Sequence, residues 1–329
     1  MSSTLPLDLE VLHRDITAWF ATAGRDLPWR RPECSPWGVM VSEFMLQQTP
    51  VVRVLPVWEQ WMQRWPEPAD LASEPSGEAV RAWGRLGYPR RALRLAEAAR
   101  RITEYHDGQV PSTYADLLAL PGVGSYTAAA IACFAFGIPE TVVDTNIRRV
   151  HARLVSGRAL PEPSYTAAEA RLAAELMPPA GHDGGELGCA WNAAVMELGA
   201  LVCTARSPRC GECPVAAACA WVAAGKPEPH YTPKGQAWAG TDRQVRGAMM
   251  AILRASDAPV EAARLLDVAP PEAASVPPGA SPAPAAAVEE ALHRLRALPA
   301  AAAQRRRCLE GLISDGLASE TSHGITLPH

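Results

Sequence analysis

The sequence predicts a mainly α-helical protein that ends in a small α+β unit. Apolar residues recur at helical spacing, as in Val54, Trp58, Trp61 and Trp65, throughout a region from about residue 7 to residue 225. Glycine and proline separate these helical patterns, and no sustained alternation of apolar and polar residues indicates a sheet there. A linker rich in proline and glycine, 226–243, then separates this first domain, 1–225, from residues 244–329.

Residues 244–329 predict a small unit similar to a winged helix. Helical patterns are followed by a short segment, 317–327, which we expect to form a hairpin that turns at 322–324. A stretch rich in proline and alanine, 267–286, is expected to be disordered. The predicted helices of this unit are 245–253, 287–298 and 301–313.

The composition describes a globular protein with a local rather than a global positive charge. Of its 329 residues, 48% are hydrophobic and 20% are charged, and the net charge is −4. Arginines nevertheless gather at 81–101, at 148–158 and at Arg305–Arg306–Arg307. A DNA backbone needs a basic face, not a basic protein, although ordinary solvated helix surfaces explain such groups equally well. Three adjacent arginines cannot share one helix face, so we expect some of the last group to point outward.

Neither a membrane segment nor a secretory leader is expected. No apolar run approaches the roughly 20 residues needed to cross a bilayer, and the first ten residues have no basic and apolar leader pattern. We expect a cytoplasmic, nucleoid-associated monomer without a membrane partner.

Four of the eight cysteines crowd into 17 residues with the spacing Cys203-x6-Cys210-x2-Cys213-x5-Cys219. Thiolates are soft ligands that suit zinc or iron–sulfur clusters. Structural zinc sites usually have two short Cys-x2-Cys pairs, and only one such pair is present. The spacing therefore favours an iron–sulfur cluster and leaves zinc as the alternative.

A glycine-containing turn lies between two helical patterns, at Leu120-Pro121-Gly122-Val123-Gly124. Gly122 and Gly124 permit a tight turn, and the amides at the start of the following helix favour an anion such as a DNA phosphate. A plain turn between helices is the alternative interpretation.

Two carboxylates are candidates for acid–base chemistry. Glu43 is an acid among apolar residues at helix spacing, and burial would raise its pKa until it holds a proton at neutral pH. Asp144 opens another helix, where the ordinary role of an aspartate is that of an N-cap. One protonated and one ionised carboxylate are what cleavage of a glycosidic bond requires.

Taken together, these motifs resemble the endonuclease III superfamily and, more closely, the adenine DNA glycosylases of the MutY family. The resemblance runs from about Trp19 to Cys219. It rests on the strings LPWR (27–30), SEFMLQQT (42–49), LGY (86–88) and PGVG (121–124), and on the cysteine loop.

This resemblance implies a two-lobed helix-hairpin-helix glycosylase fold and a [4Fe–4S] cluster held by Cys203, Cys210, Cys213 and Cys219. The partner would be mismatched double-stranded DNA, whose target nucleotide must be flipped out of the helix. The reaction would be removal of adenine opposite 8-oxoguanine or guanine, with Glu43 protonating the base and Asp144 stabilising the sugar cation. The other implied site residues are Tyr126 and Asn146, which would position Asp144; Arg25, Leu27 and Trp29, which would line the adenine pocket; Gln48, Thr49, Leu86 and Tyr88, which would engage the opposite base; and Gly122, Val123 and Gly124, which would hold phosphate.

Three features bear on specificity. Endonuclease III-like lyases carry a lysine just after the hairpin, where this chain has Tyr126, so we expect a monofunctional hydrolase. Ala193 stands where relatives usually have a polar residue, and residues 244–329 lack the strand pattern of the Nudix-like domain that usually ends the family. The alternatives are a glycosylase for another mismatch, such as thymine opposite guanine, or a non-catalytic iron–sulfur protein that binds DNA.

Overall fold

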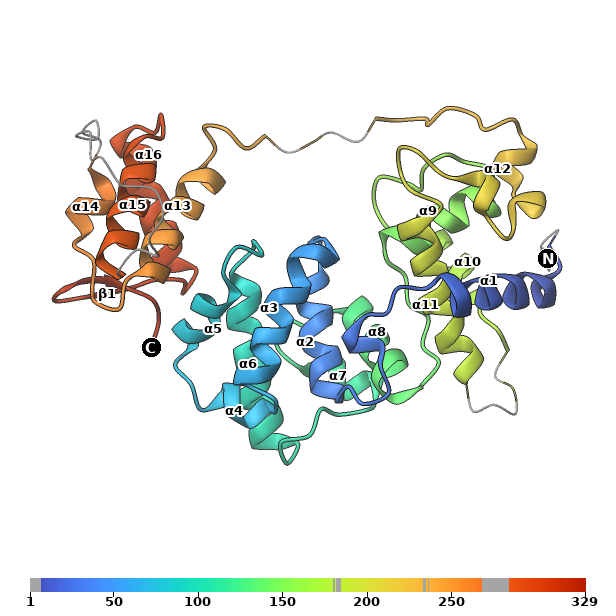
Figure 1. Cartoon of the computed structure of the whole chain (residues 1–329), viewed down its shortest axis with the longest axis horizontal. Helices are drawn as coiled ribbons and strands as arrows, with labels where there is room; N and C mark the ends of the chain where they lie inside the picture. The colour runs from blue at the N-terminus through green and yellow to red at the C-terminus, as the bar shows by residue number, and fades with distance from the viewer. Residues whose placement is uncertain (1–6, 180, 182–184, 233–234, 236, 268–283) are drawn as a thin grey trace. The chain divides into compact units, whose positions relative to one another are not determined.

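The computed structural model describes residues 7–179, 181, 185–232, 235, 237–267 and 284–329. The regular secondary structure of these residues is almost entirely helical (Figure 1), and the chain divides into two compact units built from interleaved segments. Unit 1 comprises 1–43 and 110–234, and unit 2 comprises 44–109 and 235–329. The expected mainly helical, two-lobed architecture is thereby confirmed.

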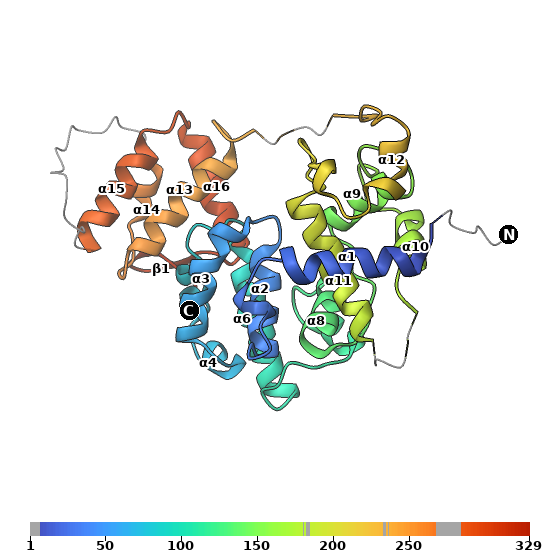
Figure 2. The ribbon, with the colours of Figure 1, turned by 45° about the vertical axis from the view of Figure 1, so that its right-hand side comes forward.

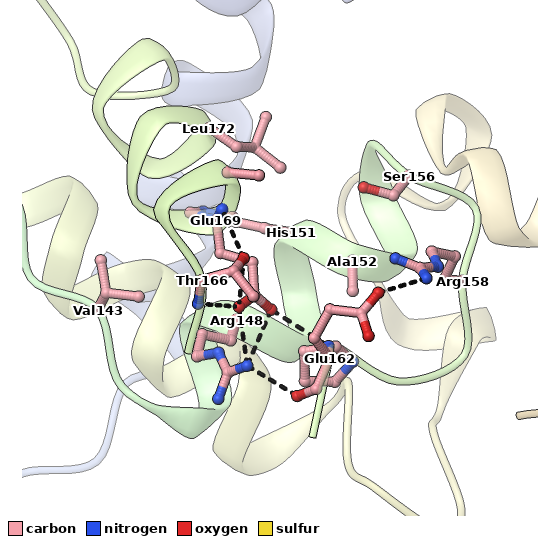
Figure 3. A pocket seen from close by; sticks show the side chains of 12 residues that line it. Val143, Arg148, His151, Ala152, Ser156, Arg158, Glu162, Thr166, Glu169 and Leu172 are labelled. Atoms are coloured by element: carbon pink, nitrogen blue, oxygen red, sulfur yellow. Dashed lines mark hydrogen bonds and ion pairs between the residues drawn. The ribbon is translucent and has the colours of Figure 1, made fainter. Parts of the chain in front are cut away.

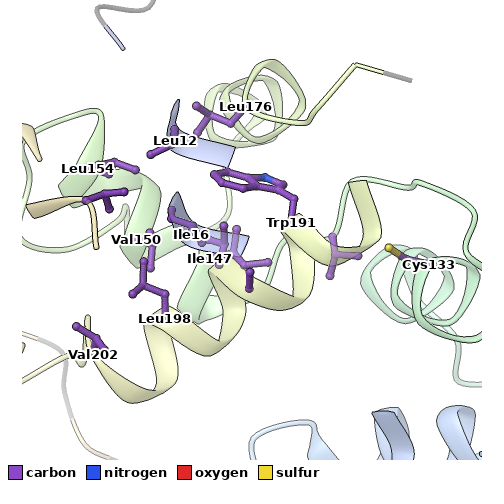
Figure 4. Packing of buried hydrophobic residues seen from close by; sticks show 14 of the residues in the cluster. Leu12, Ile16, Cys133, Ile147, Val150, Leu154, Leu176, Trp191, Leu198 and Val202 are labelled. Atoms are coloured by element: carbon purple, nitrogen blue, oxygen red, sulfur yellow. The ribbon is translucent and has the colours of Figure 1, made fainter. Parts of the chain in front are cut away.

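Unit 1 is organised around helix α11 (Glu186–Leu201), which packs against α1 (Leu9–Ala23) and α9 (Thr145–Leu154). Both views of the chain show α1 lying across α11 (Figure 2). Leu12 and Ile16 of α1, Val150 of α9, and Trp191 and Leu198 of α11 are buried together in one core (Figure 4). The remaining elements of unit 1 are η1 (Pro28–Arg30), α2 (Pro36–Leu46, which continues into unit 2), α7 (Tyr114–Ala119), α8 (Ser125–Phe136), α10 (Ala167–Glu175), η2 (Cys210–Glu212), η3 (Ala216–Ala218) and α12 (Ala220–Ala223).

The first part of unit 2 packs α6 (Arg90–Tyr105) against α4 (Pro68–Ala72) and α5 (Ser76–Trp83). Helix α3 (Val51–Arg64) completes this group and begins directly after Pro50, as its amphipathic pattern predicts. Trp61 packs edge-on against Trp65 and Trp83, with ring centroids 4.8 Å and 5.7 Å apart. Most of the tryptophans between 58 and 83 therefore serve the core.

The C-terminal part of unit 2 is a small α+β structure. It contains α13 (Asp242–Ala255), α14 (Ala262–Leu266), α15 (Pro284–Arg296), α16 (Ala302–Ser314) and an antiparallel hairpin of β1 (Ser319–Thr321) and β2 (Gly324–Thr326). An isolated bridge between Val260 and Ile325 adds a third extended segment. The predicted hairpin and three helices are present, whereas α14 and the bridge were not predicted. Residues 284–286, which were expected to be disordered, instead begin α15, and residues 268–283 of the predicted insert lie outside the described residues.

Of the three adjacent arginines of α16, Arg306 and Arg307 are exposed, as expected, whereas Arg305 is not. Arg305 is buried and donates to the carbonyls of Ala300 and Leu298, while Arg307 binds the carboxylate of Asp242. Carbonyls at the end of α15 attract the Arg305 side chain inward, which local helix geometry could not indicate. Of the three, Arg306 alone has no such partner in the part of the chain that the structure describes.

No helix within the described ranges has both the length and the apolar character needed to cross a membrane.

Candidate active site

The central feature of unit 1 is a buried carboxyl group on α2. Glu43 is only 6% exposed, and burial raises its pKa to about 7. The negative charge of Asp144 raises this pKa further, while a hydrogen bond with Tyr126 and the charge of Arg30 lower it. Glu43 can therefore hold a proton at neutral pH and also release it, which are the two properties of a general acid and base.

Tyr126 lies in the first turn of α8, where the chain leaves the glycine turn. Its phenol is hydrogen-bonded to Glu43, and burial together with the charge of Glu43 raises its pKa well above the ordinary value. The phenol therefore stays protonated. The structure thus joins Tyr126 to Glu43 by a hydrogen bond, rather than to Asp144 as the resemblance implied, although the charge of Asp144 also acts on it.

Asp144 is the N-cap of α9, and its two carboxylate oxygens have different partners. Oδ1 accepts from the backbone N–H of Ile147 at 2.7 Å, and Oδ2 accepts from Nδ2 of Asn146 at 2.7 Å. Burial raises the pKa of Asp144, while these hydrogen bonds and the charge of Arg149 lower it. Asp144 is therefore both a cap and a fixed, partly buried carboxylate, and the expected contact with Asn146 is present.

A chain of hydrogen bonds connects Asp144 with the cysteine loop. Oδ1 of Asn146 accepts from Nη2 of Arg149 at 2.7 Å, and the same guanidinium donates to the carbonyls of Gly199 and Cys203, each at 2.7 Å. Arg149 is buried and has like-charged Arg153 nearby, so its pKa is lowered. The position of the Asp144 carboxylate therefore depends on the backbone of the cysteine loop.

A second buried carboxylate, Glu197 of α11, binds two arginines. It is fully buried, and Arg25 donates to both of its oxygens, at 2.6 Å and 2.7 Å, while Arg30 donates to Oε2 at 2.9 Å. Although burial alone would raise the pKa of Glu197, these arginines lower it to about 2. Arg25 is thus held in place, and its neighbours Leu27 and Trp29 are also buried.

Sequence reasoning did not identify Glu197, Arg30 or Arg149 as part of the site. Glu197 carried the same signal that identified Glu43, an acid at an apolar position of a helix. Arg149 was grouped with a surface charge cluster, but the structure shows that Arg148, Arg149, Arg153 and Arg158 all bind protein groups.

The glycine turn has the geometry that the sequence predicted. Gly122 has a φ of 79°, in the left-handed region that favours glycine, and Val123 N–H donates to the Leu120 carbonyl at 3.2 Å. Gly124 is the N-cap of α8, and no side chain caps that helix start. Gly122 and Gly124 are exposed, so the first amides of α8 are accessible to an anion.

The residues expected to engage the opposite base lie in unit 2. Gln48 and Tyr88 have φ values of 57° and 49°, a region that residues other than glycine rarely adopt. Tyr88 is 47% exposed, and the guanidinium of Arg91 lies 4.6 Å above its ring. Arg91 also donates to the Gln47 carbonyl, which fixes both turns together.

Thr49 and Leu86 have a different position. Both are buried, and the Thr49 hydroxyl donates to the Leu86 carbonyl at 3.2 Å. They therefore join the two turns that carry Gln48 and Tyr88, and neither offers an exposed side chain.

The four clustered cysteines, in the last segment of unit 1, form no disulfide, and all are half-buried. Burial raises the pKa of Cys213 to about 11, and the charges of Cys203, Cys219 and Cys210 raise it further. Among the described residues, no three His, Cys, Asp or Glu side chains are arranged to hold a single metal ion.

A cavity of about 370 Å³ lies beside the α9 helix (Figure 3). Arg148 crosses it and binds the carboxylate of Glu169 and the carbonyl of Glu162, while Arg158 pairs with the Glu162 carboxylate. These contacts pair the charged side chains that line the cavity with one another or with carbonyls. Neither Glu43 nor Asp144 lines it.

Two family models match the chain. Residues 41–175 match the HhH-GPD superfamily of base excision DNA repair proteins, and residues 203–219 match the iron–sulfur binding domain of endonuclease III. A solved structure of a thermostable thymine-DNA glycosylase is similar, with a TM-score of 0.58 and 29% identity over 66% of this chain and 97% of that chain. These matches define a helix-hairpin-helix DNA repair glycosylase that carries a [4Fe–4S] cluster.

Comparison with individual named proteins indicates which family of DNA glycosylases this chain resembles. The adenine DNA glycosylase of Mycobacterium tuberculosis is 46% identical over 312 residues, which cover 94% of this chain and 91% of that protein. The adenine DNA glycosylase of Mycolicibacterium smegmatis is 44% identical over 310 residues, with 94% and 93% coverage. The chain therefore belongs to the adenine DNA glycosylase family, and its relationship with these proteins extends into the C-terminal unit.

Proposed function

We propose that this protein removes adenine from duplex DNA in base excision repair, and that its preferred substrate is adenine paired with 8-oxoguanine. The similarity to adenine DNA glycosylases over nearly the whole chain supports the first statement. The single observation that carries the chemistry is a buried carboxyl group with a pKa of about 7, Glu43, in the same unit as the hydrogen-bonded carboxylate of Asp144.

In the proposed mechanism, Glu43 donates its proton to the departing base. The N-glycosidic bond breaks, the electron pair leaves with the protonated base, and positive charge develops on the deoxyribose. Asp144 stabilises this cation, since its carboxylate is fixed by Asn146 and by the Ile147 amide and need not reorganise. Glu43, now ionised, accepts a proton from the attacking water. Tyr126 carries a phenol and no amine, so it cannot form a Schiff base with the sugar, and base release should leave the strand intact.

We assign recognition of the opposite base to the two turns of unit 2 that carry Gln48 and Tyr88. We infer that Gln48 and Tyr88 enter the base stack, since their strained backbones hold side chains in positions that relaxed residues would not adopt. Arg91 supports Tyr88 from one side and the Gln47 carbonyl from the other. We assign Thr49 and Leu86 to holding the turns together and Arg25, Leu27 and Trp29 to the wall of the adenine pocket.

We also infer that Cys203, Cys210, Cys213 and Cys219 are the protein ligands of the cluster. The cluster has a structural role in this proposal, because a cube with four protein thiolates offers no open iron to water. Its loop instead positions Arg149, through the Cys203 carbonyl, and thereby the Asn146 that binds Asp144.

The test is single-turnover base release from a duplex with one adenine opposite 8-oxoguanine. Asp144→Asn should slow release by about 100-fold or more, the usual scale for such an electrostatic group. Asp8→Asn is the matched control, because Asp8 caps α1 through the Val11 amide at 3.2 Å and lies outside the proposed site. If both variants lose the same small fraction of activity, Asp144 is only a helix cap and the proposed site is wrong.

A further inference from the structure

The C-terminal part of unit 2, here called the C-terminal unit, contacts helices α5 and α6 of the same unit through specific side chains. Arg81 of α5 donates to the carbonyls of Arg254 and Ser256, which end α13. Asp315, after α16, binds both Arg90 of α6 and Arg246 of α13. Arg81 and Arg90, which the sequence offered as DNA contacts, are thereby used to hold the C-terminal unit.

The end of the chain adds a close backbone contact. The Gly77 N–H donates to the Pro328 carbonyl at 2.8 Å. A Cβ at Gly77 would lie 2.3 Å from that carbonyl oxygen and 2.9 Å from the Leu327 Cβ, so only glycine fits here. This contact holds the end of the chain against the start of α5.

Two further arginines lie at this junction: Arg254, whose carbonyl accepts from Arg81, and Arg85, whose carbonyl accepts from a side chain of α3. Arg254 is partly buried, and burial together with the positive charge of Arg85 lowers its pKa to about 10, so it remains charged at neutral pH. Within the described ranges, no acid binds the side chain of either Arg85 or Arg254. A third cation, Arg53 of α3, donates to the Arg85 carbonyl. Such an arrangement is electrostatically unfavourable until an anion joins it.

The position of this cluster in the chain indicates which anion it meets. Arg85 directly precedes Leu86, in the turn that carries Tyr88, so it lies three residues before the exposed tyrosine. The anion next to a base stack is the phosphodiester of the same strand. Guanidinium groups suit this ligand because they present several donors to phosphate oxygens.

We propose that Arg85 and Arg254, with Arg53, form a binding site for one phosphodiester group of the DNA strand that carries the orphaned base. The C-terminal unit would then contribute Arg254 to DNA binding beside the Tyr88 turn, instead of reading the opposite base itself. This inference rests on the proposed function, because it assumes that the Tyr88 turn meets DNA.

The salt dependence of binding to an undamaged duplex tests the site without any catalysis. Arg254→Gln and Arg85→Gln should each weaken binding about tenfold, as loss of a charge-assisted contact does. Each should also reduce the slope of log Kd against log salt concentration by about one, as expected for one lost phosphate contact. Arg294→Gln is the matched control: it removes the same charge from an exposed arginine of the same unit that pairs with Glu290.

Three outcomes decide the proposal. If the slopes of Arg254→Gln and Arg85→Gln equal that of Arg294→Gln, the phosphate site does not exist. If Arg254→Gln fails to fold, the exposed Arg85→Gln variant decides alone, with Arg254→Lys expected to keep the wild-type slope. If Arg85→Gln and Arg254→Gln show the reduced slope but the wild-type protein releases no adenine from any duplex, the proposed function fails while the phosphate site stands.

Discussion

Replacing Tyr126 by phenylalanine should move the pH profile of base release to higher pH. The phenol is hydrogen-bonded to Glu43 and lowers its pKa, which stands at about 7. A hydrogen bond to a charged group contributes about 1.5–3 kcal/mol, and one pKa unit corresponds to about 1.4 kcal/mol. Loss of this bond should therefore raise the pKa of Glu43 by roughly one to two units.

The assay is single-turnover adenine release measured from about pH 5.5 to pH 9.5. This range covers both the pKa of Glu43 in the wild-type protein and the higher pKa expected in the variant. In the wild-type protein the rate should fall above about pH 7, where Glu43 loses its proton. In Tyr126→Phe this fall should begin at a higher pH. Asp144→Asn should be slower throughout and shift in the opposite direction, because the negative charge of Asp144 raises the pKa of Glu43. An alkaline limb that stays in place in Tyr126→Phe, or moves to lower pH, would refute the assignment of Glu43 as the acid.

Four further predictions follow from the same structure. The folded-state pKa of Glu43, about 7 against 4.5, means that stability is lost as pH rises through this window. At pH 8, Glu43→Gln should therefore have a higher melting temperature than the wild-type protein and a free energy of unfolding that is larger by roughly 3 kcal/mol. The difference should be smaller near pH 5, and equal differences at both pH values would contradict this. Glu197→Gln should destabilise unit 1 by about 1.5–3 kcal/mol, since it removes the buried negative charge that accepts hydrogen bonds from half-buried Arg25 and Arg30; an unchanged melting temperature would show that the pairing does not matter. Cys213→Ser should lower the iron content and the visible absorbance, and full iron occupancy would exclude it as a ligand. Gly77→Val should speed proteolysis within residues 235–329, because its side chain collides with the Pro328 carbonyl; an unchanged cleavage rate would count against that contact.

The helices could be predicted because their signals are local. Local apolar spacing predicted α13, α15 and α16 within about three residues of their observed ends, and it indicated helix in the region of α3. The short α14 and the Val260–Ile325 bridge could not be predicted, because both depend on the tertiary position of the final hairpin.

The site was partly predictable for a related reason. Glu43 and Asp144 stood out as acids at apolar or helix-starting positions. The bond between Tyr126 and Glu43 joins helices 83 positions apart, and no local pattern encodes it. The sequence also could not show where the arginine side chains point, because Arg149 and Arg305 turn inward toward carbonyls of other segments.

The dependence of excision on the opposite base tests the central claim most directly. Single-turnover release should be measured on duplexes that contain adenine opposite 8-oxoguanine, adenine opposite guanine, or thymine opposite guanine, each analysed with and without alkali. We expect adenine release that is fastest opposite 8-oxoguanine, no thymine release, and strand breaks only after alkali. Thymine release in place of adenine release, or strand breaks without alkali, would contradict the account of a monofunctional adenine glycosylase.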